Sequence, residues 1–441
     1  MWPDSNELAW SRGRTLQGKF LEKMSNCQLS IKYPQSFNLT ADYLLRILIV
    51  ADIFFMTRGY AISNIVEHLL FILVISRKEF REDLIFFFKS PIGIAIITFF
   101  IWQLISIFWS QSDLINSIDS LWGWRKIFLI PVVWIAFKRQ DDFKLIYHSL
   151  AFCSLIFCLI SYAMYFFNIN EFWERSAWSV MQNHSIQGVL FAFCFYTMLL
   201  YADDAYRSGD KNYKYFVFIG FGFLTNIILI GTGLSGYVSL IIFSCLLVLF
   251  FFREYIFFGL MVCSIFIVLT FISPDTPEIS IGVSDIIESV FQGKFTIDES
   301  FNTSLQRLEF WINTLVIIKD HPVLGVGAGS FELAYYDVIL LQGSTPASVI
   351  TDNPHQQFLH IMAEYGLIGL VIFGTFIFHL WKLVRIDTLD GKIFAGLLIA
   401  LVVLGFINGT LTDIVLSRVL YILAGLLVVV NFRQMPVGPT R

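Results

Sequence analysis

Apolar stretches long enough to cross a bilayer recur along this chain and constrain its fold more than any other feature. A membrane helix needs about 20 apolar residues. Charged residues make up only 15% of the chain, whereas a soluble domain carries about 25% to wet its surface. The composition therefore argues against a soluble enzyme, a disordered chain or a nucleic-acid-binding protein. The sequence predicts an all-α polytopic membrane protein with twelve spans: 41–56, 60–76, 84–109, 121–137, 143–168, 185–202, 215–232, 236–252, 256–273, 358–384, 393–408 and 418–432.

The positive charges orient these spans. Cytoplasmic loops carry an excess of Lys and Arg, and 22 of the 30 positive residues fall on the inner side when both termini are cytoplasmic. The exceptions on the outer side either anchor the chain at the interface or bind an anion such as a phosphate, for which Arg is well suited. Taken together, they favour a diphosphate-carrying lipid. These residues are Arg58, Arg125, Lys126, Arg175, Lys294, Arg307, Lys319 and Arg418.

One outer loop, residues 274–357, is much longer than an ordinary connection. We expect it to form a periplasmic subdomain with amphipathic helices, packed on the membrane bundle. It separates nine spans over 41–273 from three over 358–432, with cytoplasmic tails at 1–40 and 433–441. The predicted apolar stripe of its main helix, spaced for one helical face, consists of Leu305, Leu308, Ile312, Leu315 and Val316.

Two other patterns in the chain bear on ligands. The GVGAG stretch at 325–329 lacks the Lys-Ser/Thr of a phosphate-binding loop and predicts tight turns instead. The six cysteines show no zinc-site spacing. We therefore predict no metal site and no cofactor.

The sharpest local signal is TDNPHQQFLHIMAEYGLIGL at 351–370. Asn353 suits a helix N-cap, Pro354 suits the first turn, and Gln356 has capping-box spacing. This prediction places His355 in the first turn, where the helix dipole disfavours the imidazolium and keeps the ring neutral. His355 is then either a proton acceptor beside an anion site or a structural histidine at the interface.

Two further polar residues follow on the same predicted helix. His360 lies about 140° around the helix from His355, which makes the pair a poor metal chelate, so we interpret it as a buried, hydrogen-bonded histidine. Glu364 is a carboxylate inside a membrane span, where a charge is costly. We expect it to be either protonated or paired with a polar neighbour.

The segments SLQRLEFWINTLVIIKDHPVLGVGAGSF (304–331) and NPHQQFLHIMAEYGLIGL (353–370) together resemble the O-antigen ligase/polymerase family of bacterial inner-membrane glycosyltransferases. SIFWSQSD (106–113) and NHSIQG (183–188) are similar to other segments of that family. The matching positions are Arg307, Trp311, His321-Pro322, Gly325, Gly327, His355 and Glu364-Tyr365-Gly366.

The resemblance implies a GT-C-like enzyme of the inner membrane, with its active site facing the periplasm. Its donor would be an undecaprenyl-diphosphate-linked glycan, and its acceptor a sugar hydroxyl of the lipid A core. His355 would act as general base and Arg307 would balance charge on the leaving diphosphate, with inversion and without a metal. Binding of the diphosphate is assigned to Arg125, Lys126 and Arg418, and supporting roles to Asn353, Trp311 and Glu364.

The sequence departs from the family at one position. The stretch GTGLSGYVSL at 231–240 has no Arg where the family commonly carries one. A phosphate contact is therefore either absent or supplied by Arg125, Lys126 or Arg418.

Three alternatives remain open at this stage. A polymerase of the same family would extend O-antigen or exopolysaccharide, although polymerases often have two sizeable outer loops. A protein O-oligosaccharyltransferase is a second alternative. A lipid-linked glycan transporter is the third, but such proteins tend to show internal repeats, and we find none here. The sequence does not indicate an oligomeric state.

Overall fold

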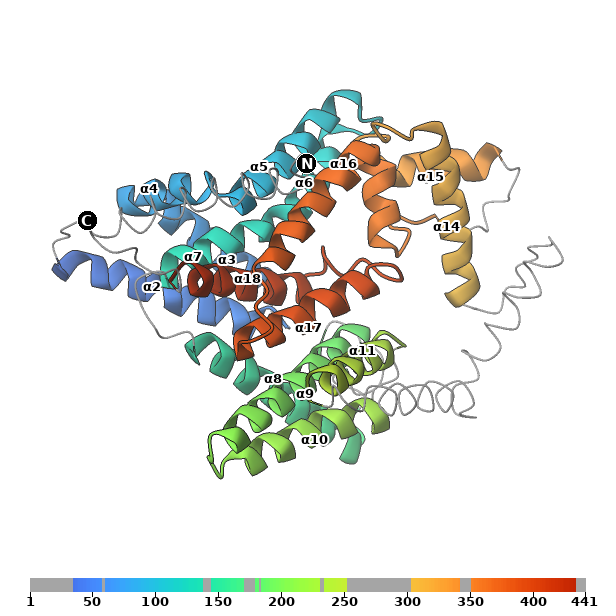
Figure 1. Ribbon diagram of the computed structural model, residues 1–441. Helices are drawn as coiled ribbons and strands as arrows, with labels where there is room; N and C mark the ends of the chain where they lie inside the picture. Colours follow the sequence, from blue (N-terminus) through green and yellow to red (C-terminus); the bar gives the residue numbers. More distant parts are fainter. Residues whose placement is uncertain are drawn as a thin grey trace, which may run out of the picture.

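The computed structural model describes residues 35–57, 60–137, 144–169, 179–181, 184–230, 234–251, 303–341 and 350–433. All of the regular secondary structure in these residues is helical (Figure 1), so the predicted all-α class is confirmed for them. The predicted ninth span lies outside the described residues. So do the two predicted tails, except for residues 35–40, where the first helix begins, and Arg433.

The helices follow the predicted apolar stretches closely. The N-terminal helices are α2 (Gln35–Phe55), α3 (Tyr60–Ser76), α4 (Lys78–Phe87), α5 (Pro91–Ser106), α6 (Leu114–Gly123) and α7 (Leu129–Phe137). The middle of the chain forms α8 (Lys144–Phe166), α9 (His184–Arg207), α10 (Tyr213–Leu229) and α11 (Leu234–Phe251). After the gap come α14 (Thr303–Asp320), α15 (Phe331–Leu341), α16 (Gln357–Lys382), α17 (Leu389–Leu404) and α18 (Leu416–Arg433).

Helix caps account for the boundaries that differ from prediction. Ser90 Oγ accepts from Gly93 N at 3.1 Å, and Pro91 follows it as the first helical residue, so the predicted span 84–109 is divided into α4 and α5. Asp113 caps α6 in the same way, which starts the fourth span at Leu114 rather than at 121. Thr388 caps α17, which begins four residues before the predicted start.

Five segments of the described chain are long and apolar enough to cross a membrane, and shorter apolar helices accompany them. The chain is thus a multi-pass membrane protein, while the total of twelve spans stays a prediction. The five segments are Pro91–Trp109, Leu114–Phe137, Lys144–Phe166, His184–Arg207 and Gln357–Lys382.

The bundle is built around helices that are apolar on all sides. Every residue of α7 is buried, and α18 packs along it, while α9 contacts α10, α11 and α17. Helices α14 and α15 lie together at one end of the bundle, beside the start of α16 (Figure 1). They form a second, smaller core with α16, while the predicted periplasmic subdomain over 274–357 stays a prediction.

The buried face of α14 differs from the predicted stripe. Ile312 and Leu315 are exposed, whereas Phe310, Asn313, Thr314 and Ile317 are buried. The predicted helix is present, but its apolar spacing was assigned to the wrong face. Polar Asn313 and Thr314 lie on the inner face because their side chains find partners there, Tyr335 OH and Phe310 O respectively.

Helix α16 is broken at Gly366, whose φ of 67° and ψ of −173° are not helical. The break separates two carbonyls from the N–H groups that would otherwise bond them, and such groups need partners when buried. The loop 322–327, which contains most of the predicted glycine turn, supplies those partners. The four bonds are Val326 N to Ala363 O (2.9 Å), Gly327 N to Glu364 O (2.9 Å), Leu367 N to Pro322 O (3.0 Å) and Ile368 N to Val323 O (3.4 Å).

Close backbone approach explains why glycine occupies these positions. A Cβ on Gly366 would lie 2.1 Å from Val323 O, and one on Gly327 would lie 2.5 Å from Ser110 Cα. Both residues also have φ values in the left-handed region that favours glycine. The tight turns predicted from GVGAG are therefore confirmed.

We predict that Gly366→Ala destabilises the protein by about 1–3 kcal/mol through backbone strain alone, with a further loss from the clash with Val323 O. Gly374→Ala is the matched control, because a Cβ at that position of the same helix meets no atom within 4 Å. Thermal unfolding of the purified protein in detergent measures both variants. Equal midpoints for the two variants would contradict the role assigned to the break.

Candidate functional site

One face of α14 lies against the loop that carries His355. Arg307, Phe310 and Trp311 are spaced i, i+3 and i+4, so they share that face. Trp311 Nε1 donates to Pro354 O at 3.0 Å, and the Phe310 ring lies 6.0 Å from the His355 ring between centroids. Because Arg307 lies four residues before Trp311, it is on the face of α14 that contacts the His355 loop.

The His355 loop differs from the predicted helix start. The N-cap of α16 is Gln356, whose Oε1 accepts from Leu359 N at 2.5 Å, rather than Asn353. His355 precedes the helix with a φ of 53°, and its N–H donates to Asn353 Oδ1 at 2.8 Å. A non-glycine residue in the left-handed region stores strain and is often found at a functional site.

His355 favours the neutral state, as predicted, but for a different reason. Burial lowers the pKa of its imidazole below the ordinary value, and the nearby positive charge of Arg307 lowers it further. His355 directly precedes the N-cap Gln356 and is not in the first helical turn where it was predicted. The Asn408 side chain, in the loop between α17 and α18, hydrogen-bonds His355. The sequence contained no signal for that contact.

Arg307 is largely buried without a carboxylate partner among the described residues. Its Nη1 donates to Ile407 O at 3.4 Å, and burial lowers the pKa of its guanidinium. A buried cation is costly unless it is paired. Arg307 is therefore well placed to gain an anionic partner.

The predicted diphosphate ligands Arg125 and Arg418 have carboxylate partners. Glu67 Oε1 lies 2.9 Å from Arg125 Nε, and Glu67 Oε2 lies 2.5 Å from Arg418 Nη2. Asp52 lies 3.6 Å from Arg418 Nε, and Asn64 Oδ1 accepts from both guanidinium groups. Arg418 is 0% exposed. In this arrangement the network joins α2, α3, α18 and the turn Trp124–Phe128, and a phosphate role for either Arg stays a prediction.

Lys126 is also occupied by the protein. Its Nζ donates to Thr412 O at 2.6 Å and lies 3.4 Å from Asp413 O. These bonds hold the loop 405–415, which also carries Asn408. Within the described residues, Lys126 therefore helps to position the loop whose Asn408 side chain interacts with His355.

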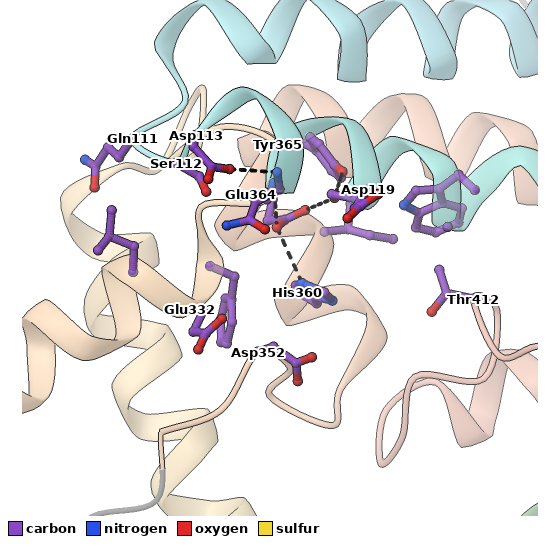
Figure 2. Close-up of a pocket in the computed structure, with 18 of the residues that line it drawn as sticks. Gln111, Ser112, Asp113, Asp119, Glu332, Asp352, His360, Glu364, Tyr365 and Thr412 are labelled. Carbon is purple, nitrogen blue, oxygen red and sulfur yellow. Dashed lines mark hydrogen bonds and ion pairs between the residues drawn. The ribbon is translucent and has the colours of Figure 1, made fainter. Parts of the chain in front are cut away.

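A cavity of about 670 Å³ lies beside this cluster, between α6, α15, the loop 350–356 and the first turns of α16 (Figure 2). Glu364 and His360 line it, with 3.7 Å between His360 Nε2 and Glu364 Oε1. Glu364 also accepts from Ser120 Oγ at 2.9 Å and from Gly329 N at 3.0 Å. Of the two states expected for Glu364, the structure favours the paired one.

The structure brings together part of the predicted site. Arg307, Trp311, Asn353 and His355 form one cluster, and Glu364 lies in the adjoining cavity. Arg125, Lys126 and Arg418 lie in or beside a separate buried network. The carboxylates of Asp119, Glu332 and Asp352 around the cavity were not predicted from the sequence, because exposed acidic residues on three separate segments carry no motif. The stretch 231–240 has no Arg where the resemblance leads us to expect one, and its first three residues, 231–233, lie outside the described residues.

Comparison with known proteins finds similarity to one family over part of the chain. Residues 217–374, about a third of the chain, match the family model described as O-antigen ligase. The match includes Arg307, Trp311, His355 and Glu364, but not Arg125, Lys126 or Arg418. No curated protein matches the sequence.

We predict that Arg418→Gln destabilises the protein by about 3–5 kcal/mol, because it leaves the buried Asp52 without its cation and gives the buried network a net negative charge. Glu67→Gln combined with Arg418→Gln keeps the network neutral, and it should recover part of the lost stability. Thermal unfolding of both single variants and the double variant measures this coupling. Additive losses would contradict a structural network.

Proposed function

Because residues 217–374 match the O-antigen ligase family model, we propose that the chain transfers a glycan from undecaprenyl diphosphate to a sugar hydroxyl of the lipid A core, on the periplasmic face of the inner membrane. The observation that carries this proposal is that a largely buried Arg307, which has no carboxylate partner among the described residues, lies beside His355, whose pKa is lowered. A diphosphate supplies the anion that Arg307 lacks, and a neutral imidazole accepts a proton.

The proposed step forms one bond and breaks another. The acceptor oxygen attacks the anomeric carbon of the donor sugar as His355 takes the hydroxyl proton. The bond between that carbon and the diphosphate oxygen breaks, and the electron pair leaves with the diphosphate, whose charge Arg307 balances. Direct displacement inverts the anomeric centre. Because the lipid diphosphate is already an activated donor, no nucleotide is consumed.

Asn353 and Trp311 support this step by holding the His355 loop. Asn353 Oδ1 accepts from the His355 N–H, and Trp311 binds the carbonyl of the residue before His355. Both contacts constrain a backbone conformation that histidine adopts only at a cost. The His355 ring is therefore already held in position before the substrates bind.

We expect His355→Ala and Arg307→Ala each to abolish transfer while membrane expression is kept, because neither side chain belongs to the main apolar core. A deletion strain complemented with each variant tests this through its lipopolysaccharide ladder. Loss of capped lipopolysaccharide with accumulation of lipid-linked polymer indicates a ligase. Lipopolysaccharide with a single repeat unit indicates a polymerase, and a normal ladder in either variant would refute the assignment.

Arg307 should also control the protonation of His355. Burial and the Arg307 charge lower the pKa of His355 below the ordinary value of a histidine, so the ring stays neutral to a lower pH than an exposed histidine does. Arg307→Gln removes the charge and should raise that pKa, whereas Lys319→Gln, near the C-terminal end of the same helix, should not. NMR titration of histidine-labelled protein, assigned with His355→Gln, measures the shift. An unchanged or lower pKa in Arg307→Gln would contradict it.

A further inference from the structure

The cavity beside His355 has the size of a small-ligand site. Its volume of about 670 Å³ lies within the range of roughly 300–1,000 Å³ that such sites occupy. Aromatic side chains and hydrogen-bonding groups line it together, as is usual for a pocket that orients a polar ligand. The aromatic residues are Trp124, Phe331, Tyr336 and Tyr365, and the uncharged polar ones are Gln111, Ser112, Asn116, Ser120 and Thr412.

Glu364 is a buried carboxylate in the wall of this cavity, and its side chain is held by several contacts. It is 4% exposed. It is held from three directions, by Ser120 of α6, by the backbone N–H of Gly329 and by His360 one turn earlier. Tyr365 OH shares the Ser120 hydroxyl at 2.9 Å. His360 is therefore oriented by a buried carboxylate, while its ring remains part of the cavity wall (Figure 2).

The charge of the lining limits what can bind. Asp119 of α6, Glu332 of α15 and Asp352 of the His355 loop are exposed carboxylates around the cavity, and no Lys or Arg is among the described residues that line it. An ionised carboxylate only accepts hydrogen bonds, so it suits hydroxyl donors and repels phosphate. A diphosphate is therefore the wrong ligand for this cavity, and a neutral sugar is a suitable one.

The cavity and Arg307 lie around the same histidine. Asp352 and His360, three residues before and five residues after His355 in the sequence, both line the cavity. Arg307 acts on His355 from α14 and is absent from the cavity lining. A transfer reaction needs its base at the acceptor hydroxyl and its cation at the leaving group, and this arrangement provides separate places for the two.

We propose that this cavity is the acceptor subsite, in which the His360–Glu364 pair, Asp119 and Glu332 bind an unphosphorylated sugar and exclude a phosphorylated one. The substrate class deepens the proposed function and rests on it. The donor diphosphate then binds on the Arg307 side of His355, outside the cavity.

Binding of a soluble acceptor tests the subsite without turnover. The probe is core oligosaccharide released from lipopolysaccharide, used before and after removal of its phosphate groups, with the full-length protein in nanodiscs. We expect the dephosphorylated form to bind about tenfold more tightly than the phosphorylated form. Asp119→Asn combined with Glu332→Gln should weaken binding of the dephosphorylated form by a similar factor and reduce the preference, and His360→Ala should also weaken binding.

Asp337→Asn is the matched control, because it removes an exposed carboxylate from α15 that does not line the cavity. It should leave both affinities unchanged. Equal binding of the two probes to the wild type, or an unchanged affinity in the double variant, would overturn the subsite. If the expected binding is found but a lipid-linked donor gives no transfer, the proposed glycan transfer fails and the sugar site stands.

Discussion

The break in α16 at Gly366 is the feature on which the rest of the candidate site depends. An unbroken helix would satisfy its own backbone groups and would offer nothing to the loop 322–327. Because Gly366 interrupts the ladder, two carbonyls and two N–H groups bond that loop instead. The same loop continues to Gly329, whose N–H binds Glu364, and to Ser330, whose hydroxyl bonds Ser110 at 2.7 Å. One backbone irregularity thereby joins α16, α15 and the start of α6 around the cavity.

Positive charge on this side of the protein is divided between two environments. Arg125 and Arg418 are neutralised by Glu67 and Asp52 inside the bundle, where an unpaired charge would be costly. Among the described residues, Arg307 bonds a backbone carbonyl and has no carboxylate partner. Of these three arginines it is therefore the one whose charge an anionic ligand can use, and it lies close enough to His355 to lower the pKa of the imidazole. The carboxylates of Asp119, Glu332 and Asp352 line the cavity instead, and Arg307 is not among its lining residues.

Much of the fold could be predicted because a membrane span needs a long apolar stretch, and such stretches are visible in a sequence. The exceptions follow from short-range chemistry. Ser90 and Pro91 divide one predicted span, and Thr388 starts another four residues early, because a capping side chain outweighs the apolar pattern at a helix end. Asn353 looked like the cap of α16 but instead bonds the N–H of His355, which leaves Gln356 to cap the helix. The apolar residues of α14 were assigned to the wrong face because Asn313 and Thr314 find polar partners inside.

The sequence by itself determined the all-α class, the multi-pass character, the resemblance to the O-antigen ligase family and the choice of Arg307 and His355 as the centre of the candidate site. These properties depend on composition, on spacing along one helix and on local motifs, and Arg307 and Trp311 share a face because they are four residues apart. Only the tertiary structure decided which positive residues are already paired, because Glu67 and Arg418 are separated by hundreds of residues. It also decided that Asp119, Glu332 and Asp352 surround one cavity. Contacts between distant segments depend on how the helices pack, and no local pattern encodes that packing.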